Sequence, residues 1–382
     1  MKIVVAPDKF KGSLTAKQVA EAIRRGLLDA HPNWNVRTFP MADGGDGTME
    51  CLVDATGGHY GSTVAKDPIG RSRNVEYGIL GDGLTCVAEL ASSSGLTLLA
   101  PHERDPLRAS TFGFGQLIRA GLDAGARRFI LCLGGSATND GGAGMLQALG
   151  FGLLGDKGLP IGLGGEELRG LRILTRDGAD PRLTQCEWIA ACDVNNPLLG
   201  LHGASAVFGP QKGATAEMVG RLDEALSNWA DILTATTGIR VHDMPGAGAA
   251  GGVAAALAAA LGARLAPGVR ICLEASGIER ELAGADLVIT GEGRIDSQTL
   301  SGKTPLGVAQ AARNFGVPVL LVGGDIADDV TLEHWQQYGV RRIIGLREKE
   351  MSMLEAISQA SRLLENRMFC FFRDESEKFF LA

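Results

Sequence analysis

Aromatic residues are scarce in this sequence of 382 residues, where Phe, Trp and Tyr together make up 5%. Proteins that bind single-stranded nucleic acid stack the bases on aromatic side chains, so this composition argues against that class. Basic residues are also in the minority, with 37 Lys and Arg against 44 Asp and Glu and a formal net charge of -7. Because a nucleic-acid surface needs an excess of positive charge, we expect no nucleic-acid partner.

Long apolar runs and metal-binding patterns are missing too. Every uninterrupted apolar stretch, including the alanine-rich run at residues 253–261, is too short to span a bilayer. The six histidines show no zinc-binding spacing such as H-E-x-x-H. The seven cysteines are scattered without a C-x-x-C pair, and several lie inside apolar runs. These features predict a cytoplasmic protein with reduced core cysteines and no membrane association.

Glycine is the residue in excess, with 54 copies that cluster in short loops. The most informative loop, residues 134–144, follows an apolar run at 128–133 and precedes a helical pattern at 145–149. A glycine-rich turn between a strand and a helix presents backbone N–H groups to an anion. We expect this loop to bind a phosphate or carboxylate through Gly134, Gly135, Ser136, Thr138 and Asn139. A tight turn with a well-capped helix is the alternative.

A second candidate site lies at the start of the chain. Residues 2–6 predict a buried strand, and the loop that follows carries Lys9 and Lys11 before an amphipathic helix near residues 15–30. Open α/β sheets bind ligands at the carboxyl ends of their strands, so these lysines suit an anion. Two solvated lysines are the alternative. A further strand at residues 35–39 leads into another glycine-acid loop at 42–48.

The middle of the chain has a different character. Residues 60–91 alternate between apolar and polar with turns between, which predicts antiparallel strands. Glu89 lies in an apolar run and is either a functional group or half of an ion pair, because a buried carboxylate needs a partner. The strand predicted at 188–192 ends at Asp193, which offers a base or a metal ligand. A capped turn before Pro197 is the alternative there.

Residues 246–251 match the pattern G-x-G-x-x-G of dinucleotide-binding proteins. The preceding segment is polar and ends in Pro245, so it makes a poor strand. We therefore favour an alanine-rich packing helix over a nicotinamide site, and an NAD-dependent oxidoreductase stays as an alternative.

The last clear pattern is a strand at residues 285–290, followed by a long polar loop at 291–304 and a helix at 305–315. The loop ends in Gly-Lys-Thr, but Ser297 stands where a P-loop needs its first glycine. With Glu292, Arg294, Asp296 and Lys303, it still offers cations for phosphates and an acid for magnesium, as phosphoryl transfer requires.

Strand-like runs at 317–322 and 340–346 complete a βαβαβ pattern at the C-terminal end. Both ends of the chain are therefore α/β and can share one sheet. We expect an α/β fold of two α/β domains. A Rossmann/flavodoxin-like parallel sheet is built from residues 1–60 and 285–382, and a mixed α/β domain at residues 61–284 is inserted between them.

Seven motifs, taken in order, resemble those of the bacterial glycerate kinases of the type that usually forms 2-phosphoglycerate: residues 6–13, 42–48, 67–71, 134–142, 191–197, 208–213 and 290–299. The resemblance runs from residue 1 to about residue 365. It implies phosphorylation of D-glycerate by ATP, assisted by Mg²⁺, in a cleft between two α/β domains. It leaves the oligomeric state open, and phosphorylation at position 3 is an alternative to position 2.

On this hypothesis the glycerate carboxylate is bound by Lys9, Lys11 and Ser13, with Arg71 as a second candidate. The ATP phosphates lie along the loop at residues 134–139, along Gly291, Glu292 and Gly293, and against Lys303. One or two of Asp140, Asp193 and Asp296 hold Mg²⁺, and Asp193 orients or deprotonates the attacking hydroxyl. Besides the oxidoreductase, a non-catalytic protein that binds a small hydroxy acid is an alternative from another class.

One segment departs from the family pattern. Residues 367–382 carry clustered Phe side chains and do not resemble the helical end of the family. They suggest an altered reading frame or a private extension, which is either packed on the last helix or exposed.

Overall fold

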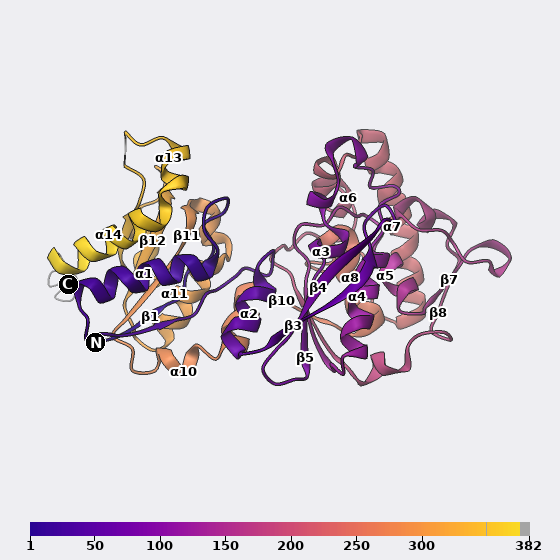
Figure 1. The fold of residues 1–382 in the computed structure, drawn as a ribbon. Helices are drawn as coiled ribbons and strands as arrows, with labels where there is room; N and C mark the ends of the chain where they lie inside the picture. The colour runs from indigo at the N-terminus through magenta and orange to yellow at the C-terminus, as the bar shows by residue number, and fades with distance from the viewer. Residues whose placement is uncertain (349, 375–382) are drawn as a thin grey trace. The chain divides into compact units, whose positions relative to one another are not determined.

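The computed structural model describes residues 1–348 and 350–374, and the chain forms two compact units. Unit 1 combines Met1–Asp43 with the chain from Pro267 onward, and unit 2 is Gly44–Ala266. Figure 1 shows that indigo and yellow segments, from opposite ends of the chain, share unit 1. Both units are α/β, as expected from the sequence. The contacts divide the chain at 43/44 and 266/267, whereas the sequence analysis placed the junctions at 60/61 and 284/285.

Unit 1 is built on a five-stranded, fully parallel sheet in the order β13-β12-β11-β1-β2. This is the flavodoxin-like order, and it confirms the parallel sheet made from both chain ends. The strand order reverses between β1 and β11, which is where such sheets bind ligands. The strands are β1 (Lys2–Val5), β2 (Asn35–Thr38), β11 (Leu287–Ile295), β12 (Val319–Ile326) and β13 (Val340–Gly345).

The helices of unit 1 cover this sheet. Helix α1 begins where Thr15 and Gln18 form a capping box, and it buries Val19, Ile23 and Leu27. Its apolar side chains recur at helical spacing, which is why the sequence predicts it. The helices are α1 (Ala16–Ala30), α9 (Gly268–Ser276), α10 (Glu279–Leu282), α11 (Thr304–Asn314), α12 (Leu332–Gln336), α13 (Met353–Ser358) and α14 (Ala360–Asp374).

Helix α14 decides between the packed and the exposed alternative for the part of residues 367–382 that the structure describes. It runs to Asp374 and lies beside α1, and Phe372 is fully buried in the core of unit 1 (Figure 1). The two helices approach closely because Gly26 has no side chain, and a Cβ there would lie 2.3 Å from the backbone oxygen of Glu365. Phe371 and Phe372 are therefore packing groups of the core. Residues 375–382 lie outside the described part of the chain.

Unit 2 contains a six-stranded mixed sheet in the order β10-β9-β6-β5-β4-β3. Strands β3, β4 and β5 pair antiparallel, which confirms the pattern expected for residues 60–91, and the other pairs are parallel. The strands are β3 (His59–Lys66), β4 (Ser72–Ile79), β5 (Thr85–Glu89), β6 (Arg128–Cys132), β9 (Glu187–Ala191) and β10 (Arg264–Ala266), with a separate hairpin of β7 (Gly152–Leu154) and β8 (Ile173–Thr175).

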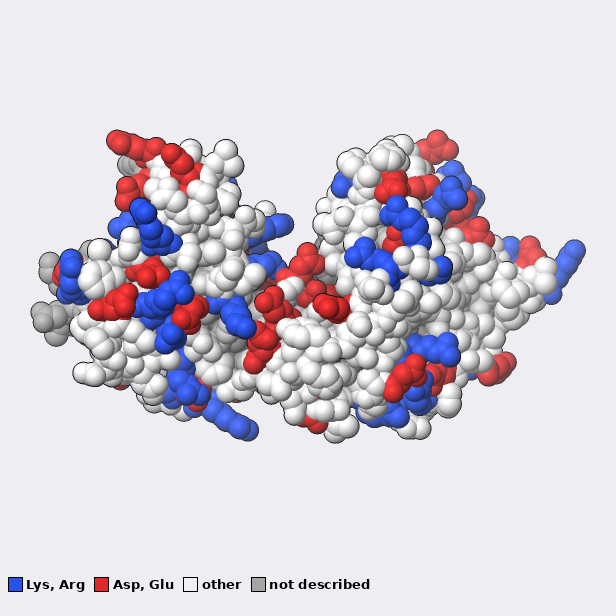
Figure 2. All heavy atoms as spheres, viewed as in Figure 1, with Lys and Arg blue, Asp and Glu red and all other residues white. Residues whose placement is uncertain are grey.

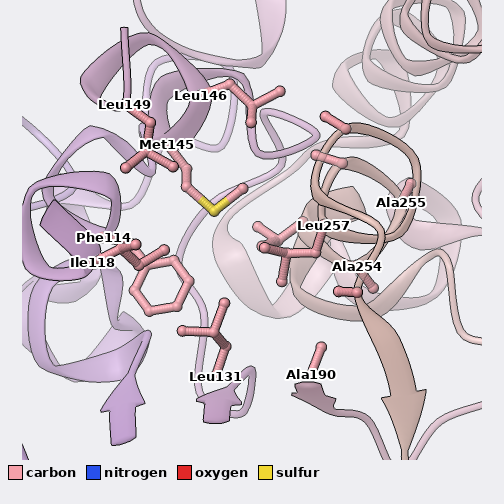
Figure 3. Packing of buried hydrophobic residues seen from close by; sticks show 14 of the residues in the cluster. Phe114, Ile118, Leu131, Met145, Leu146, Leu149, Ala190, Ala254, Ala255 and Leu257 are labelled. Carbon is pink, nitrogen blue, oxygen red and sulfur yellow. The ribbon is translucent and has the colours of Figure 1, made fainter. Parts of the chain in front are cut away.

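The core of unit 2 combines large and very small side chains. Figure 3 shows Phe114 and Met145 facing Leu257 and Ala254, between helices and the strand that carries Leu131. Helix α8 is buried on nearly all sides, and its alanines allow this close packing. The helices are α2 (Thr48–Thr56), α3 (Ala91–Ser94), α4 (Phe112–Asp123), α5 (Ala143–Ala148), α6 (Ala204–Phe208), α7 (Ala216–Thr237) and α8 (Ala249–Leu261).

The surface carries both signs of charge. On the face drawn in Figure 2, Lys and Arg are interspersed with Asp and Glu over each unit. Within the described residues, a search for helices with the length and hydropathy of a membrane span finds none.

Candidate active site

An acid–lysine cluster (Asp8, Glu292, Asp296, Lys303 and Thr304) lies at the carboxyl ends of β1 and β11, at the point where the strand order reverses. The backbone N–H of Asp8 donates to the carbonyl of Gly291 over 2.8 Å and so fixes the loop after β1 to β11. The Asp8 carboxylate accepts from the N–H of Lys9 and from the Thr304 hydroxyl, both at 2.6 Å. Asp8 thus connects the first loop to the start of α11.

The pKa values of two acids of this cluster are raised toward neutral pH. Burial raises the pKa of Asp8 to about 6, and nearby Asp43 adds to the effect, while the hydrogen bond from Thr304 opposes it. Burial also raises the pKa of Glu292 to about 7, with Asp8 and Asp296 adding and Thr299 and Lys303 opposing. The Oε1 atom of Glu292 is buried and accepts no hydrogen bond from the described residues. Buried acids with raised pKa values at such a sheet edge are typical of functional sites.

Lys303 supplies the positive charge of the acid–lysine cluster. Its Nζ lies 3.7 Å from Glu292 Oε2 and 3.9 Å from Asp296 Oδ1, and its side chain is 34% exposed. Lys303 is also the N-cap residue of α11. A part-exposed ammonium group at a helix start can bind a phosphate or carboxylate oxygen. The structure therefore brings together Glu292, Asp296 and Lys303 as the sequence predicts.

The segment around Gly291 differs from its expected loop conformation. Strand β11 continues to Ile295, and Gly291 and Glu292 pair with Val322 and Gly323 of β12. Glycine is required at 291 because a Cβ there would lie 1.9 Å from the Val322 carbonyl oxygen. Gly291, Glu292 and Gly293 thus belong to a strand, and the polar loop before α11 begins at Asp296.

The candidate glycerate-binding residues in the loop after β1 differ in exposure and in hydrogen bonding. Lys9 is half-buried and Lys11 is exposed in the turn that links Phe10 to Leu14. The Ser13 hydroxyl donates to the carbonyl of Ile357 over 2.9 Å and so ties this loop to α13. Lys9 and Lys11 therefore follow β1 at the sheet edge of the acid–lysine cluster, whereas the Ser13 hydroxyl has a partner within the fold.

A second polar group, the Lys212 cluster (Ser136, Thr138, Asn139, Asp140 and Lys212), lies at the ends of β5 and β6 in unit 2. Lys212 is fully buried, and its Nζ donates to Ser136 Oγ over 2.8 Å and to the Thr138 carbonyl over 2.7 Å. Asn139 Nδ2 donates to Ser205 Oγ over 2.9 Å. Burial lowers the pKa of Lys212 to about 7, and the Asp140 carboxylate opposes that shift.

Asp140 has all its oxygen atoms engaged inside the Lys212 cluster. Oδ2 accepts from the Thr111 N–H and hydroxyl, both at 2.8 Å, and from the Gly144 N–H at 3.3 Å, while Oδ1 accepts from the Gly142 N–H at 3.2 Å. Burial raises the pKa of Asp140, and these hydrogen bonds oppose the rise. This arrangement fixes the turn into α5.

Asp193 follows β9 and is exposed at the carboxyl end of the sheet of unit 2. The glycine run at 246–252 packs against the loops around it. The Gly248 N–H donates to the Asn196 carbonyl and the Gly141 N–H to the Gly251 carbonyl, both over 3.0 Å. A Cβ on Gly251 would lie 2.1 Å from the Thr138 carbonyl oxygen. The G-x-G-x-x-G match is therefore a packing feature that leads into α8, as favoured from the sequence.

Arg71 and Glu89 both have partners within unit 2. The Arg71 guanidinium pairs with Asp67 and, over 2.8 Å, with Glu103. Glu89 Oε1 accepts from the Met49 N–H over 2.9 Å at the start of α2, so it stabilises that helix terminus. Among the described residues, no three His, Cys, Asp or Glu side chains are placed to hold a metal ion by themselves.

Sequence reasoning missed Asp8, Thr304 and Lys212 as site residues. Lys212 stands in the segment Phe208–Gly213, which the sequence shows only as a constrained loop with a lysine. Its burial arises from contacts with Ser136 and Thr138, more than 70 positions away along the chain, which no local pattern reveals. For Asp8, the signal available was its place directly after a buried strand.

These features define a class: an α/β protein of two units, with an acid–lysine cluster at the switch point of a parallel sheet and a glycine loop over a buried lysine. Comparisons with known proteins give the family. Residues 3–374 match the glycerate kinase family, and the chain belongs to it.

The similarity to individual relatives extends over nearly the whole chain. The chain is 47% identical over 365 residues to a glycerate kinase from Bacillus subtilis (strain 168), and the match covers 96% of this chain and 95% of the relative. It is 46% identical over 346 residues to the glycerate 2-kinase of Escherichia coli (strain K12), covering 91% and 90%. A crystal structure from Salmonella typhimurium LT2, provisionally named glycerate kinase 2, matches with a TM-score of 0.90 at 43% identity and covers 99% of both chains. The expected family, enzyme class and fold are confirmed.

Proposed function

We propose that this protein transfers the γ-phosphoryl group of ATP to the 2-hydroxyl of D-glycerate, giving 2-phosphoglycerate and ADP. Membership of the glycerate kinase family supports the kinase reaction, and the name of the Escherichia coli relative supports position 2. The observation that carries the proposal is the acid–lysine cluster, which places Lys303 and two acids with raised pKa values at the ligand-binding edge of the unit 1 sheet.

In the proposed reaction the glycerate hydroxyl oxygen attacks the γ-phosphorus, and the bond to the bridging oxygen of the β-phosphate breaks. Lys303 stabilises negative charge on the phosphate oxygens, and Lys9 and Lys11 bind the glycerate carboxylate. The hydroxyl proton passes to a carboxylate. Asp193 is the base that the sequence favours, and Glu292 is a second candidate because its pKa of about 7 lies near working pH.

Mg²⁺ fits the donors that are present. Magnesium is usually held by one or two carboxylates together with substrate phosphates, so a site without three protein ligands is compatible with it. Of the three candidate acids, Asp140 is fully buried with both carboxylate oxygens engaged, so either Asp296 or Asp193 would hold the ion together with phosphate oxygens. When bound, Mg²⁺ would supply charge neutralisation on the phosphates. The loop at residues 134–139 would bind phosphate oxygens.

The direct test is release of ADP by purified protein with ATP and Mg²⁺, with and without D-glycerate. We expect release that depends on D-glycerate, and phosphorus NMR of the product separates 2-phosphoglycerate from the 3-isomer. Lys303→Ala and Asp193→Asn should each lower kcat by about 100-fold or more, as loss of an electrostatic or proton-transfer group does. If both variants keep turnover within a few-fold of wild type, these roles are wrong.

The same preparations test the alternatives from other classes. The packed glycine run at 246–252 does not support an NAD-dependent oxidoreductase, so titration with NADH should leave nicotinamide fluorescence unchanged. A non-catalytic binding protein would bind D-glycerate without any ADP release. The enzymes among its relatives favour catalysis instead.

A further inference from the structure

The hydrogen bonds of Lys212 determine how the Ser136 hydroxyl is oriented. When Lys212 is protonated, its ammonium group has donors only, so Ser136 Oγ and the Thr138 carbonyl then both accept from it. The single hydrogen of the Ser136 hydroxyl is therefore left to donate in another direction. No described residue accepts it, and Ser136 lies at the rim of the buried cluster with 8% of its surface exposed.

The backbone beside Ser136 offers further donors. Gly135 is exposed, and the N–H groups of Gly134, Gly135 and Ser136 donate no hydrogen bond to any part of the chain that the structure describes. Gly135 has a positive φ of 73°, a conformation that favours glycine. A hydroxyl and successive backbone N–H groups on one turn form an environment for an oxyanion.

The charge of Lys212 matters to such a ligand. A Cβ on Gly135 would lie 3.4 Å from an Asp46 carboxylate oxygen, so an anion at this turn has a negative neighbour. Lys212 lies directly behind Ser136 and is the cation hydrogen-bonded to this loop. Burying an ammonium group is unfavourable unless its charge and donors are used.

We propose that Lys212 is a positioning residue that fixes the Ser136 hydroxyl as a donor toward an oxyanion of a substrate. The oxyanion is either a phosphate group of the nucleotide or the carboxylate of the acid substrate. The inference rests on the proposed kinase function and names a residue of its binding site.

The test compares wild type, Lys212→Met, Ser136→Ala and the double variant in the ADP-release assay, with KM measured separately for ATP and D-glycerate. We expect each single variant to raise KM for one substrate by about 10- to 100-fold, as loss of a charge-assisted hydrogen bond does. A higher KM for ATP would mean that Ser136 binds a phosphate of the nucleotide, and a higher KM for D-glycerate would mean that it binds the carboxylate. Because Lys212 acts through Ser136, the double variant should bind no more weakly than Lys212→Met alone.

Asn228→Leu is the matched control for a merely structural effect. Its amide donates to the carbonyls of Leu168 and Leu171, so its loss should lower the unfolding midpoint and leave both KM values unchanged. If the KM of the double variant is raised by the product of the two single-variant fold-changes, the two residues act independently and the proposal is wrong. If Lys212→Met does not fold, Ser136→Ala alone decides, because unchanged KM values for both substrates refute the role. A wild type without glycerate-dependent ADP release instead removes the kinase proposal, and this inference with it.

Discussion

The folded protein disfavours the ionised form of Glu292, because this side chain is largely buried. Its pKa is raised from 4.5 to about 7. Because the folded state favours the neutral form, the resulting stabilisation is complete below about pH 4.5 and is lost as the pH rises through 7. Glu292→Gln is neutral at every pH. Its unfolding free energy should equal that of wild type near pH 4.5 and exceed it by up to roughly 3 kcal/mol at pH 8, while kcat falls.

Urea unfolding of both proteins at pH 5, 6, 7 and 8 measures this difference. Glu333→Gln changes an exposed acid of α12 in the same unit and serves as control, with no comparable pH-dependent gain. A gain for Glu292→Gln that is the same at every pH would show that the ionised form is not disfavoured in the folded protein.

For single residues, the sequence shows which side chains are available but not what surrounds each of them in the fold. Lys303, Glu292 and Asp296 are found because they fall within one short polar stretch. Asp140 stands in an equally polar stretch, yet its carboxylate is enclosed by Thr111 from 29 positions away. Lys212 is hidden for the same reason. Burial and hydrogen-bond partners depend on the fold, so a local pattern cannot separate a ligand-binding acid from a structural one.

Helix α14 is the element whose role the sequence leaves open, and its apolar face supports a firm prediction. Phe372 is fully buried, and its ring meets Trp34 edge-on at a centroid distance of 5.4 Å. Phe372→Ala should lower the unfolding free energy by about 3–5 kcal/mol because it leaves a cavity in the core. Phe369→Ala, on the half-buried side of the helix, should lower it less.

The same argument predicts the effect of truncation after Asn366. The shortened chain loses Met368, Phe371 and Phe372 from the core of unit 1 and should unfold at a lower temperature than the full chain. Thermal unfolding by circular dichroism measures both proteins. A truncated chain as stable as the full one would mean that the last turns of α14 add nothing to the core.

Elements with a strong apolar period are predictable from this sequence. The apolar spacing and the Thr15 cap fix α1, and compact apolar runs fix β1, β6 and β9. Strand β11 is predictable only in its first half. The four residues after Thr290 are glycine or charged, and this half of the strand stays in the sheet because it pairs with β12 as far as Ile326. Pairing between distant strands is not visible in a local window.

At the scale of the whole molecule, the sequence predicts the parallel sheet because strands from both ends are buried and apolar. The junctions between the two units are harder to predict from the sequence, because they depend on which unit a surface helix contacts. Helix α9 directly follows unit 2 in the chain, yet its Val269 packs against Gly307 of α11. A Cβ on Gly307 would lie 2.6 Å from the Val269 side chain. That contact joins α9 to unit 1.

The two placements of the junctions differ in a measurable way. A fragment of residues 44–266 keeps α2, whose Met49 N–H binds Glu89, and leaves α9 out. A fragment of residues 61–284 loses α2, begins inside β3 and exposes the apolar face of α9. We therefore expect the first fragment to fold alone and to unfold cooperatively, with buried Trp188 and Trp229 giving blue-shifted fluorescence. The second should unfold at lower urea and bind a hydrophobic dye. If residues 61–284 are instead the more stable fragment, then β3 and α9 belong with it and the junctions lie where the sequence placed them.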